Sequence, residues 1–149
     1  MIQRIQTLFL IELIFLGLSL IFVPCQTIVT QVSNVPIYLL PLSNFQTNLT
    51  HLLAIILNVL GIVISIFTIF SFKKRELQVK LCYSLIVLWL ILMACMMLSP
   101  FVASTNNIVE IQINYFVVAI GLFSVVAAYF AAYFIKKDIN LLKSADRIR

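Results

Sequence analysis

Residues 73–80, KKRELQVK, decide the fold because they separate two apolar runs. The runs are residues 52–72 before this segment and residues 81–99 after it. An apolar helix of about 20 residues crosses the ~30 Å hydrocarbon core of a bilayer. The short charged segment between the runs therefore predicts an antiparallel hairpin of two membrane-spanning helices.

Two further apolar runs, 5–23 and 113–135, flank this hairpin and bring the expected number of spans to four. The basic residues lie only at alternate ends of the four runs. They are Arg4, Lys73, Lys74, Arg75, Lys80, Lys136, Lys137, Lys143, Arg147 and Arg149. This is the positive-inside pattern, which predicts that both termini lie in the cytoplasm.

The composition supports a membrane protein of one domain. The chain has 149 residues, of which 63% are hydrophobic and 10% charged, whereas soluble domains carry about 25% charged residues. The formal net charge is +5. The basic residues follow the ends of the spans and form no recognisable motif or face. We therefore expect them to contact anionic lipid headgroups and not to bind nucleic acid.

The two segments expected on the outer side, 24–50 and 100–112, alternate in places between apolar and polar residues. Residues 27–32 read TIVTQV and residues 109–113 read VEIQI. Alternation with β-branched residues is typical of strands. We therefore expect a small outer cap of two or three strands, with prolines at its edges and turns.

Small residues inside the spans predict the helix contacts. Gly61 and Ser65 lie on one face of the second span, and Ser124, Ala128 and Ala132 form a stripe along the fourth. Small side chains allow neighbouring backbones to approach closely in a membrane. The stripe is expected to form the tightest contact, within the chain or between chains.

Glu12 is the one acidic or basic side chain within a span. It lies eight residues, or about 12 Å of helix, beyond Arg4. A carboxylate at this depth is unfavourable by several kcal/mol unless it is protonated, hydrated or paired. It is either a proton- or cation-coupled site, or a structural residue that bonds another helix or a partner subunit. Ser65 and Tyr129 are expected at a similar depth and are the candidates to form a hydrogen bond with Glu12.

The first of these alternatives has a precedent in small multidrug transporters, which are also short four-helix proteins with a Glu in the first span. The chain resembles them only at Glu12. Its 27-residue outer segment and strong charge bias differ from that family's plan. The resemblance implies a small proton-coupled transporter, which we retain as the alternative function.

Other chemistry has little support in the sequence. The acids are scattered over both sides, His51 is the only histidine, and the chain has no C-x-x-C motif. We therefore expect no enzyme, no metal site and no cofactor. A bridge between Cys25 and Cys95 is conceivable, although three free thiols are favoured. Asn58 in the second span is expected to bond a neighbouring helix.

The tail 136–149 is amphipathic and has three possible arrangements. It continues the fourth span, bends along the inner leaflet or docks on a partner. Arg4, Lys143, Asp146, Arg147 and Arg149 share the inner side with it and are the docking candidates. Asp146 and Arg4 are a possible ion pair. A solvated positive flank is an equally supported interpretation.

The two ends of the chain resemble a known family. These ends are residues 1–7, MIQRIQT, residues 135–138, IKKD, and residues 143–149, KSADRIR. They are similar to those of small four-span membrane proteins from Bacteroidetes that are catalogued as a domain of unknown function. The resemblance implies a bacterial cytoplasmic (inner) membrane location and no established activity.

The sequence therefore predicts an all-α, antiparallel four-helix transmembrane bundle with a small β-containing outer cap. The preferred function is a non-enzymatic accessory or scaffolding subunit of a membrane complex. Its expected partners are the lipid bilayer and either another membrane protein or further copies of the chain.

Overall fold

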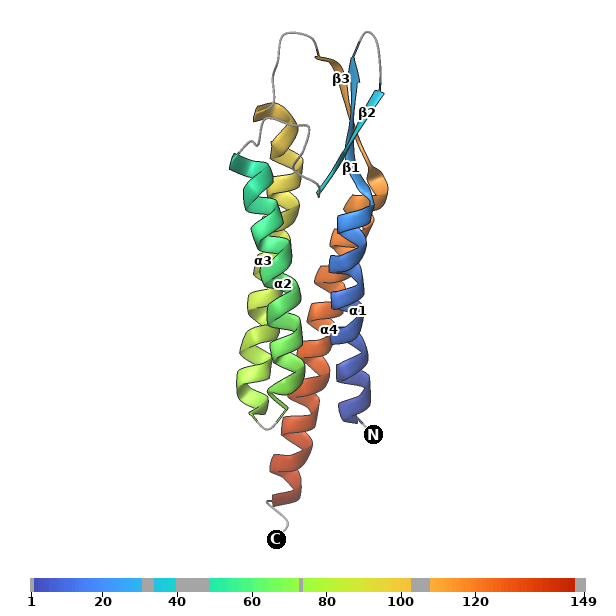
Figure 1. Ribbon diagram of the computed structural model, residues 1–149. Coiled ribbons are helices and arrows are strands. Elements are labelled where there is room, and N and C mark those ends of the chain that lie inside the picture. Colours follow the sequence, from blue (N-terminus) through green and yellow to red (C-terminus); the bar gives the residue numbers. More distant parts are fainter. Residues whose placement is uncertain (1, 31–33, 40–48, 73, 103–107, 147–149) are drawn as a thin grey trace.

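The computed structural model describes most of the chain and shows an elongated helical bundle with a small sheet at one end (Figure 1). The described residues are 2–30, 34–39, 49–72, 74–102 and 108–146.

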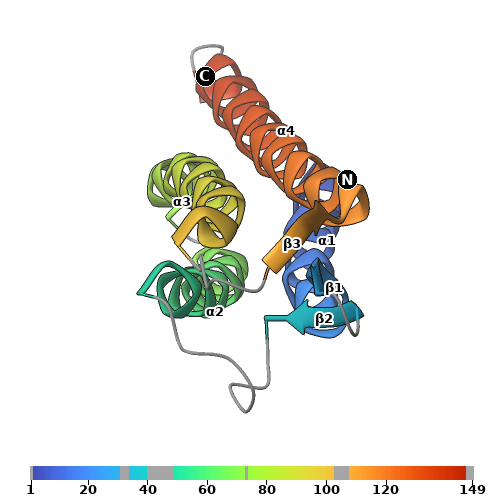
Figure 2. The ribbon, with the colours of Figure 1, turned by 90° about the horizontal axis from the view of Figure 1, so that it is seen from above.

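Four helices form the bundle, and each is long and apolar enough to cross a membrane. They run α1 Ile2–Phe22, α2 Leu49–Phe70, α3 Arg75–Val102 and α4 Tyr115–Asp146. Consecutive helices are antiparallel, and α4 returns to pack against α1, which closes a ring in chain order (Figures 1 and 2). The prediction of a four-helix bundle is therefore confirmed.

A short connection explains why α2 and α3 are neighbours. Between α2 and α3, the backbone N–H of Ser71 donates to Phe67 O and that of Lys74 donates to Ser71 O, so the chain reverses within one turn. α3 begins at Arg75, earlier than the predicted run of 81–99, and it ends at Val102. The helix includes residues 76–80 because this segment is rich in good helix formers.

The bundle exposes large apolar side chains along its outer surface. Phe15, Phe67 and Phe123 are each more than half exposed on α1, α2 and α4. A water-soluble monomer rarely presents apolar surface on this scale. In a bilayer these side chains contact lipid tails and need no further cover.

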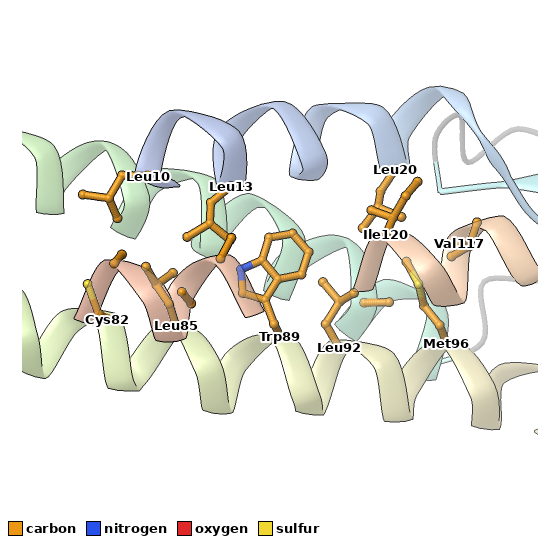
Figure 3. Packing of buried hydrophobic residues seen from close by; sticks show 14 of the residues in the cluster. Leu10, Leu13, Leu20, Cys82, Leu85, Trp89, Leu92, Met96, Val117 and Ile120 are labelled. Atoms are coloured by element: carbon orange, nitrogen blue, oxygen red, sulfur yellow. The ribbon is translucent and has the colours of Figure 1, made fainter. Parts of the chain in front are cut away.

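Trp89 of α3 occupies the centre of the interior and is fully buried. Figure 3 shows it in a row with Leu85 and Leu92, one turn away on either side, and with Leu13 of α1 pointing toward the row. Trp in membrane proteins usually lies at the membrane boundary, so a fully buried Trp in the middle of α3 serves the packing of the helices.

The sheet has the strand order β2-β1-β3 and all its pairs are antiparallel. β1 is Pro24–Thr30, β2 is Asn34–Tyr38 and β3 is Ile108–Ile113. β1 follows α1 directly and β3 leads into α4, so the strand pair continues the antiparallel helix pair beyond the bundle (Figure 1). The predicted cap is therefore a three-stranded sheet.

Side-chain amides join the sheet to the helices. Asn114 donates from Nδ2 to Pro24 O at 2.9 Å, while its Oδ1 accepts from the N–H of Phe116 at 3.0 Å and caps α4. Gln26 donates to Met96 O at 2.6 Å and ties β1 to α3. The cap is thus anchored to helices on both sides of the bundle.

The three cysteines are free and buried, so the conceivable Cys25–Cys95 bridge is not formed. Cys25 lies in β1, beyond the end of α1. Burial raises the pKa of the Cys25 thiol to about 11, against a smaller lowering by a hydrogen bond with the backbone of Leu39.

Candidate functional site

The described basic side chains gather where α1 begins, α4 ends and α2 turns into α3 (Figure 1). We call this end, which carries Lys74, Lys80, Lys136, Lys137 and Lys143, the basic end. The opposite end, which carries the strands, is the sheet end. The candidate sites lie at the basic end and at the middle of α1.

An ion pair joins α3 to α4 at the basic end. Arg75 Nη1 lies 3.0 Å from Asp138 Oδ2, and the two side chains are 27% and 15% exposed. Reduced contact with water strengthens this pair relative to a fully exposed one. It holds the extension of α4 beside the first turn of α3, and neither residue was singled out as a site in the sequence.

α4 continues without a break to Asp146, so the tail continues the fourth span as a helix and does not bend away from it; docking of the tail on a partner stays a prediction. The 32 residues of α4 extend about 48 Å, which exceeds the hydrocarbon thickness by several turns. The extension projects past the other helices (Figure 1). The length of α4 leaves room for the predicted span 113–135 and for a segment that extends beyond it.

A groove of about 480 Å³ lies between the extension of α4 and the first turns of α3. We call it the lysine groove. It is lined by Glu76, Val79, Lys80, Lys136, Ile139, Asn140 and Lys143. Its rim carries three ammonium groups and one carboxylate, while its floor is apolar.

Tyr83 marks the apolar limit of the lysine groove. The Nζ atom of Lys136 lies 5.0 Å from the centroid of the Tyr83 ring, within the range of a cation–π contact. Tyr83 follows Val79 and Lys80 by about one turn on α3. An amphipathic Tyr next to the last charged residues is typical of a membrane–water boundary.

Glu12 is the middle residue of the 21-residue helix α1, about 15 Å from either end. Its side chain is exposed, and it belongs to the outward stripe that includes Leu8 and Phe15, which are 64% and 67% exposed. The carboxylate therefore lies on the outer surface of the bundle and not in its interior.

The proposed neighbours of Glu12 do not bond it. Ser65 is fully buried on α2 and donates its hydroxyl to Gly61 O at 2.8 Å. Tyr129 is 55% exposed on α4, with its ring edge-on to Phe130. Equal depth along neighbouring helices was insufficient because these side chains point in different directions around the bundle.

Asn58 joins α1 to α2. It is 1% exposed and donates from Nδ2 to Gly17 O at 3.1 Å. Gly17 permits this approach, because a Cβ there would lie 2.8 Å from Cγ1 of Ile62. Asn58 therefore contributes to helix packing, and Gly17, which sequence reasoning missed, is the small residue that matches it.

The small residues named from the sequence lie in the interior. Gly61 is buried against Leu88 and Trp89 of α3. The fourth-helix residues Ser124, Ala128 and Ala132 are at most 1% exposed. The stripe therefore packs within the chain.

Of the docking candidates, the structure describes the side chain of Lys143, which is exposed and lines the lysine groove. The side chains of Arg4, Asp146, Arg147 and Arg149 lie outside the described part of the chain, and so does the possible Asp146–Arg4 pair. The observed pair at this end joins Arg75 and Asp138 instead.

Two buried glutamines at the basic end were also missed. Gln6 of α1 donates to Phe134 O of α4 at 3.2 Å, and Gln78 of α3 donates to Thr68 O of α2 at 2.8 Å. Both line a smaller pocket of about 230 Å³. The sequence did offer a signal for them. Gln6 and Gln78 are uncharged but form hydrogen bonds, and they stand at the ends of apolar runs, where charged residues are usual.

Within the part of the chain that the structure describes, no group of three or more His, Cys, Asp or Glu residues is placed to hold a metal ion. His51 is half-buried in the first turn of α2.

Comparison with known proteins gives one match. A family model described as a domain of unknown function (DUF4293) matches residues 2–148. No curated protein and no solved structure matches the chain.

Proposed function

The chain belongs to the DUF4293 family, whose function is unknown, and we propose that this protein is a non-enzymatic accessory or scaffolding subunit of a membrane complex. We assign it to the bacterial cytoplasmic membrane, with both termini in the cytoplasm. The outward position of Glu12 on α1 is the observation that carries the proposal.

The assigned orientation follows from the distribution of charge. In the sequence, all ten Lys and Arg residues flank or follow the four apolar runs at alternate ends, and those whose side chains the structure describes lie at the basic end. Basic residues near span ends favour the cytoplasmic side during insertion. The basic end therefore lies in the cytoplasm and the sheet end on the opposite side of the membrane.

An outward Glu at mid-span is unfavourable in lipid. On insertion scales, a charged residue at the centre of a membrane helix contributes an unfavourable free energy of about 3 kcal/mol. Among the described residues, none forms a hydrogen bond or ion pair with Glu12. A helix from outside the bundle would remove this penalty by offering a hydrogen-bond donor or a cation at the same depth.

The partner is inferred to be a different protein. Every Lys and Arg of this chain lies outside the four apolar runs. A second copy thus has no Lys or Arg to place at the depth of Glu12, and a symmetric α1–α1 contact would bring two carboxylates together. The chemistry fits a transmembrane helix that brings a Lys or Arg to mid-span, which a second copy of this chain cannot do.

Photo-crosslinking in native membranes tests this proposal. A benzoylphenylalanine at Leu8 or Phe15, one turn on either side of Glu12, should give an adduct with one membrane protein. The cross-linked peptide should carry a donor or cation within its span. The matched control is Val63, which is 54% exposed on α2 and lies away from this stripe.

The dependence on Glu12 is tested in the same experiment. Glu12→Leu should reduce the Leu8 adduct more than tenfold, whereas Ile11→Leu, a change at the neighbouring position, should leave it intact. Equal adducts at Leu8 and Val63, or adducts that persist in Glu12→Leu, would contradict the proposal. If none form and Glu12→Gln abolishes proton-dependent uptake into vesicles, the transporter alternative replaces it.

The tail offers a second test of the accessory role. A protein tagged on the sheet side is purified in mild detergent with and without residues 143–149. Loss of a stoichiometric partner from the shortened chain would add the tail to the docking surface. Retention of that partner would restrict docking to the spans.

A further inference from the structure

We propose that the lysine groove binds the phosphate of an anionic phospholipid from the leaflet at the basic end. The groove is formed where α3 begins and where α4 leaves the apolar run. This inference is independent of Glu12 and of any protein partner.

Charge is the first argument. Lys80 of α3 faces Lys136 and Lys143 of α4 across the groove, and Glu76 is the one acidic residue of its lining. In the described part of the chain, none of the three lysines lies within ion-pair distance of a carboxylate. Three ammonium groups around one hollow favour an anion.

The neighbouring ion pair leaves these lysines available. Asp138 lies on the same stretch of α4, but its carboxylate is engaged by Arg75 at 3.0 Å. The pair also fixes the relative position of α3 and α4. The groove therefore keeps its shape and its net positive charge without a ligand.

The apolar floor favours a lipid over a free anion. Val79 is 8% exposed and Ile139 is partly buried beneath the lysines. On the side toward the membrane, the groove is bounded by the Lys136–Tyr83 contact. A phospholipid can place its phosphate among the ammonium groups and its glycerol and acyl region along the apolar surface.

The position of the groove matches that of a headgroup. Lys136 directly follows Ile135, which is fully buried and ends the apolar run of α4. Phosphates of the adjacent leaflet lie at this level, where basic pockets between helices bind anionic lipids. Asn140 adds an amide N–H₂ group that can donate to a phosphate oxygen.

Lipid titration of the purified full-length protein, followed by native mass spectrometry, tests the proposal. The ligands are phosphatidylglycerol, phosphatidylcholine as the lipid without net charge, and inorganic phosphate as the soluble anion. Phosphatidylglycerol should bind at least tenfold more tightly than phosphatidylcholine. Inorganic phosphate at millimolar concentration should not displace it.

Two double variants that carry the same net charge distinguish binding in the groove from attraction by the total charge of the basic end. Lys136→Gln with Lys143→Gln should weaken the binding of phosphatidylglycerol more than tenfold, because each lysine contributes about fivefold to the affinity. Lys74→Gln with Lys137→Gln removes the same charge outside the groove and should change affinity less than threefold. Glu76→Gln should strengthen binding, and it remains informative if the first variant fails to fold.

Three results would overturn the proposal. Equal binding of both lipids would show that the groove does not select charge. An equal loss in the two double variants would show that the basic end acts only through its total charge. Displacement by inorganic phosphate would assign the groove to a soluble anion.

Discussion

The close approach of α1 and α2 at Gly17 makes a specific prediction about stability. An added Cβ would lie 2.8 Å from Cγ1 of Ile62 and 3.3 Å from Oδ1 of Asn58. Carbon atoms in favourable contact are about 3.5–4.0 Å apart, so Gly17→Ala must push the helices apart or force Ile62 from its rotamer. Overpacking of this kind is unfavourable by about 1–3 kcal/mol.

The same change also strains the bond between the helices. The Asn58 amide donates to Gly17 O at 3.1 Å, and interhelical bonds in membranes are worth about 0.6 kcal/mol on average. We therefore expect Gly17→Ala to lower the free energy of unfolding by about 2 kcal/mol relative to its control. The control is Gly61→Ala, whose nearest neighbour is a terminal methyl of Leu88 at 3.2 Å.

The assay is equilibrium unfolding in dodecyl maltoside titrated with dodecyl sulfate. The fluorescence of Trp89 reports it well, because Trp89 is the single tryptophan and is fully buried. Both variants change Gly to Ala within a helix, so their difference measures the clash and not helix propensity. Adding Ile62→Ala to Gly17→Ala should recover about 1 kcal/mol of coupling. Equal stability of Gly17→Ala and Gly61→Ala would refute the close contact of α1 with α2.

Three further predictions follow from single contacts. Asp138→Ala leaves Arg75 unpaired in a partly buried position and should lower the free energy of unfolding by about 1–3 kcal/mol in the same titration; no change would show that the pair is dispensable. Gln26→Leu removes the donor to Met96 O and should increase hydrogen exchange in β1 while the helices keep their protection; unchanged exchange in β1 would contradict that anchor. In a chain with Cys25 as its only cysteine, alkylation by iodoacetamide at pH 8 should be about 100-fold slower than for an ordinary thiol, because a pKa near 11 instead of 9.0 reduces the thiolate. As the pH rises, the Cys25 thiol of the unfolded chain loses its proton at a lower pH than that of the folded chain. The stability that the protonated Cys25 gives to the fold is therefore present below about pH 9 and is lost as the pH rises toward about 11. A pH series of the unfolding titration will detect this loss.

The candidate sites differ in how far the sequence predicted them. Glu12 was found because the sequence alone shows a carboxylate inside an apolar run. The prediction that Ser65 and Tyr129 bond it was wrong, because depth along a helix does not give the direction of a side chain around that helix. The lysine groove was not predicted, since it combines residues of α3 and α4 that are more than fifty positions apart in the chain.

The sequence by itself determined the number of spans, their approximate limits, the end of the bundle that carries the basic residues and the presence of a small strand-containing cap. These properties depend on the length of apolar runs, on alternation and on charge, which are local along the chain. Only the tertiary structure decided which face of each helix turns inward, and with it the outward position of Glu12, the Gly17–Asn58 contact and the lysine groove. The physical reason is that lipid and protein interior are both apolar. A helix between them has no polar face to mark its outer side, so the direction of each side chain is set by close packing between helices.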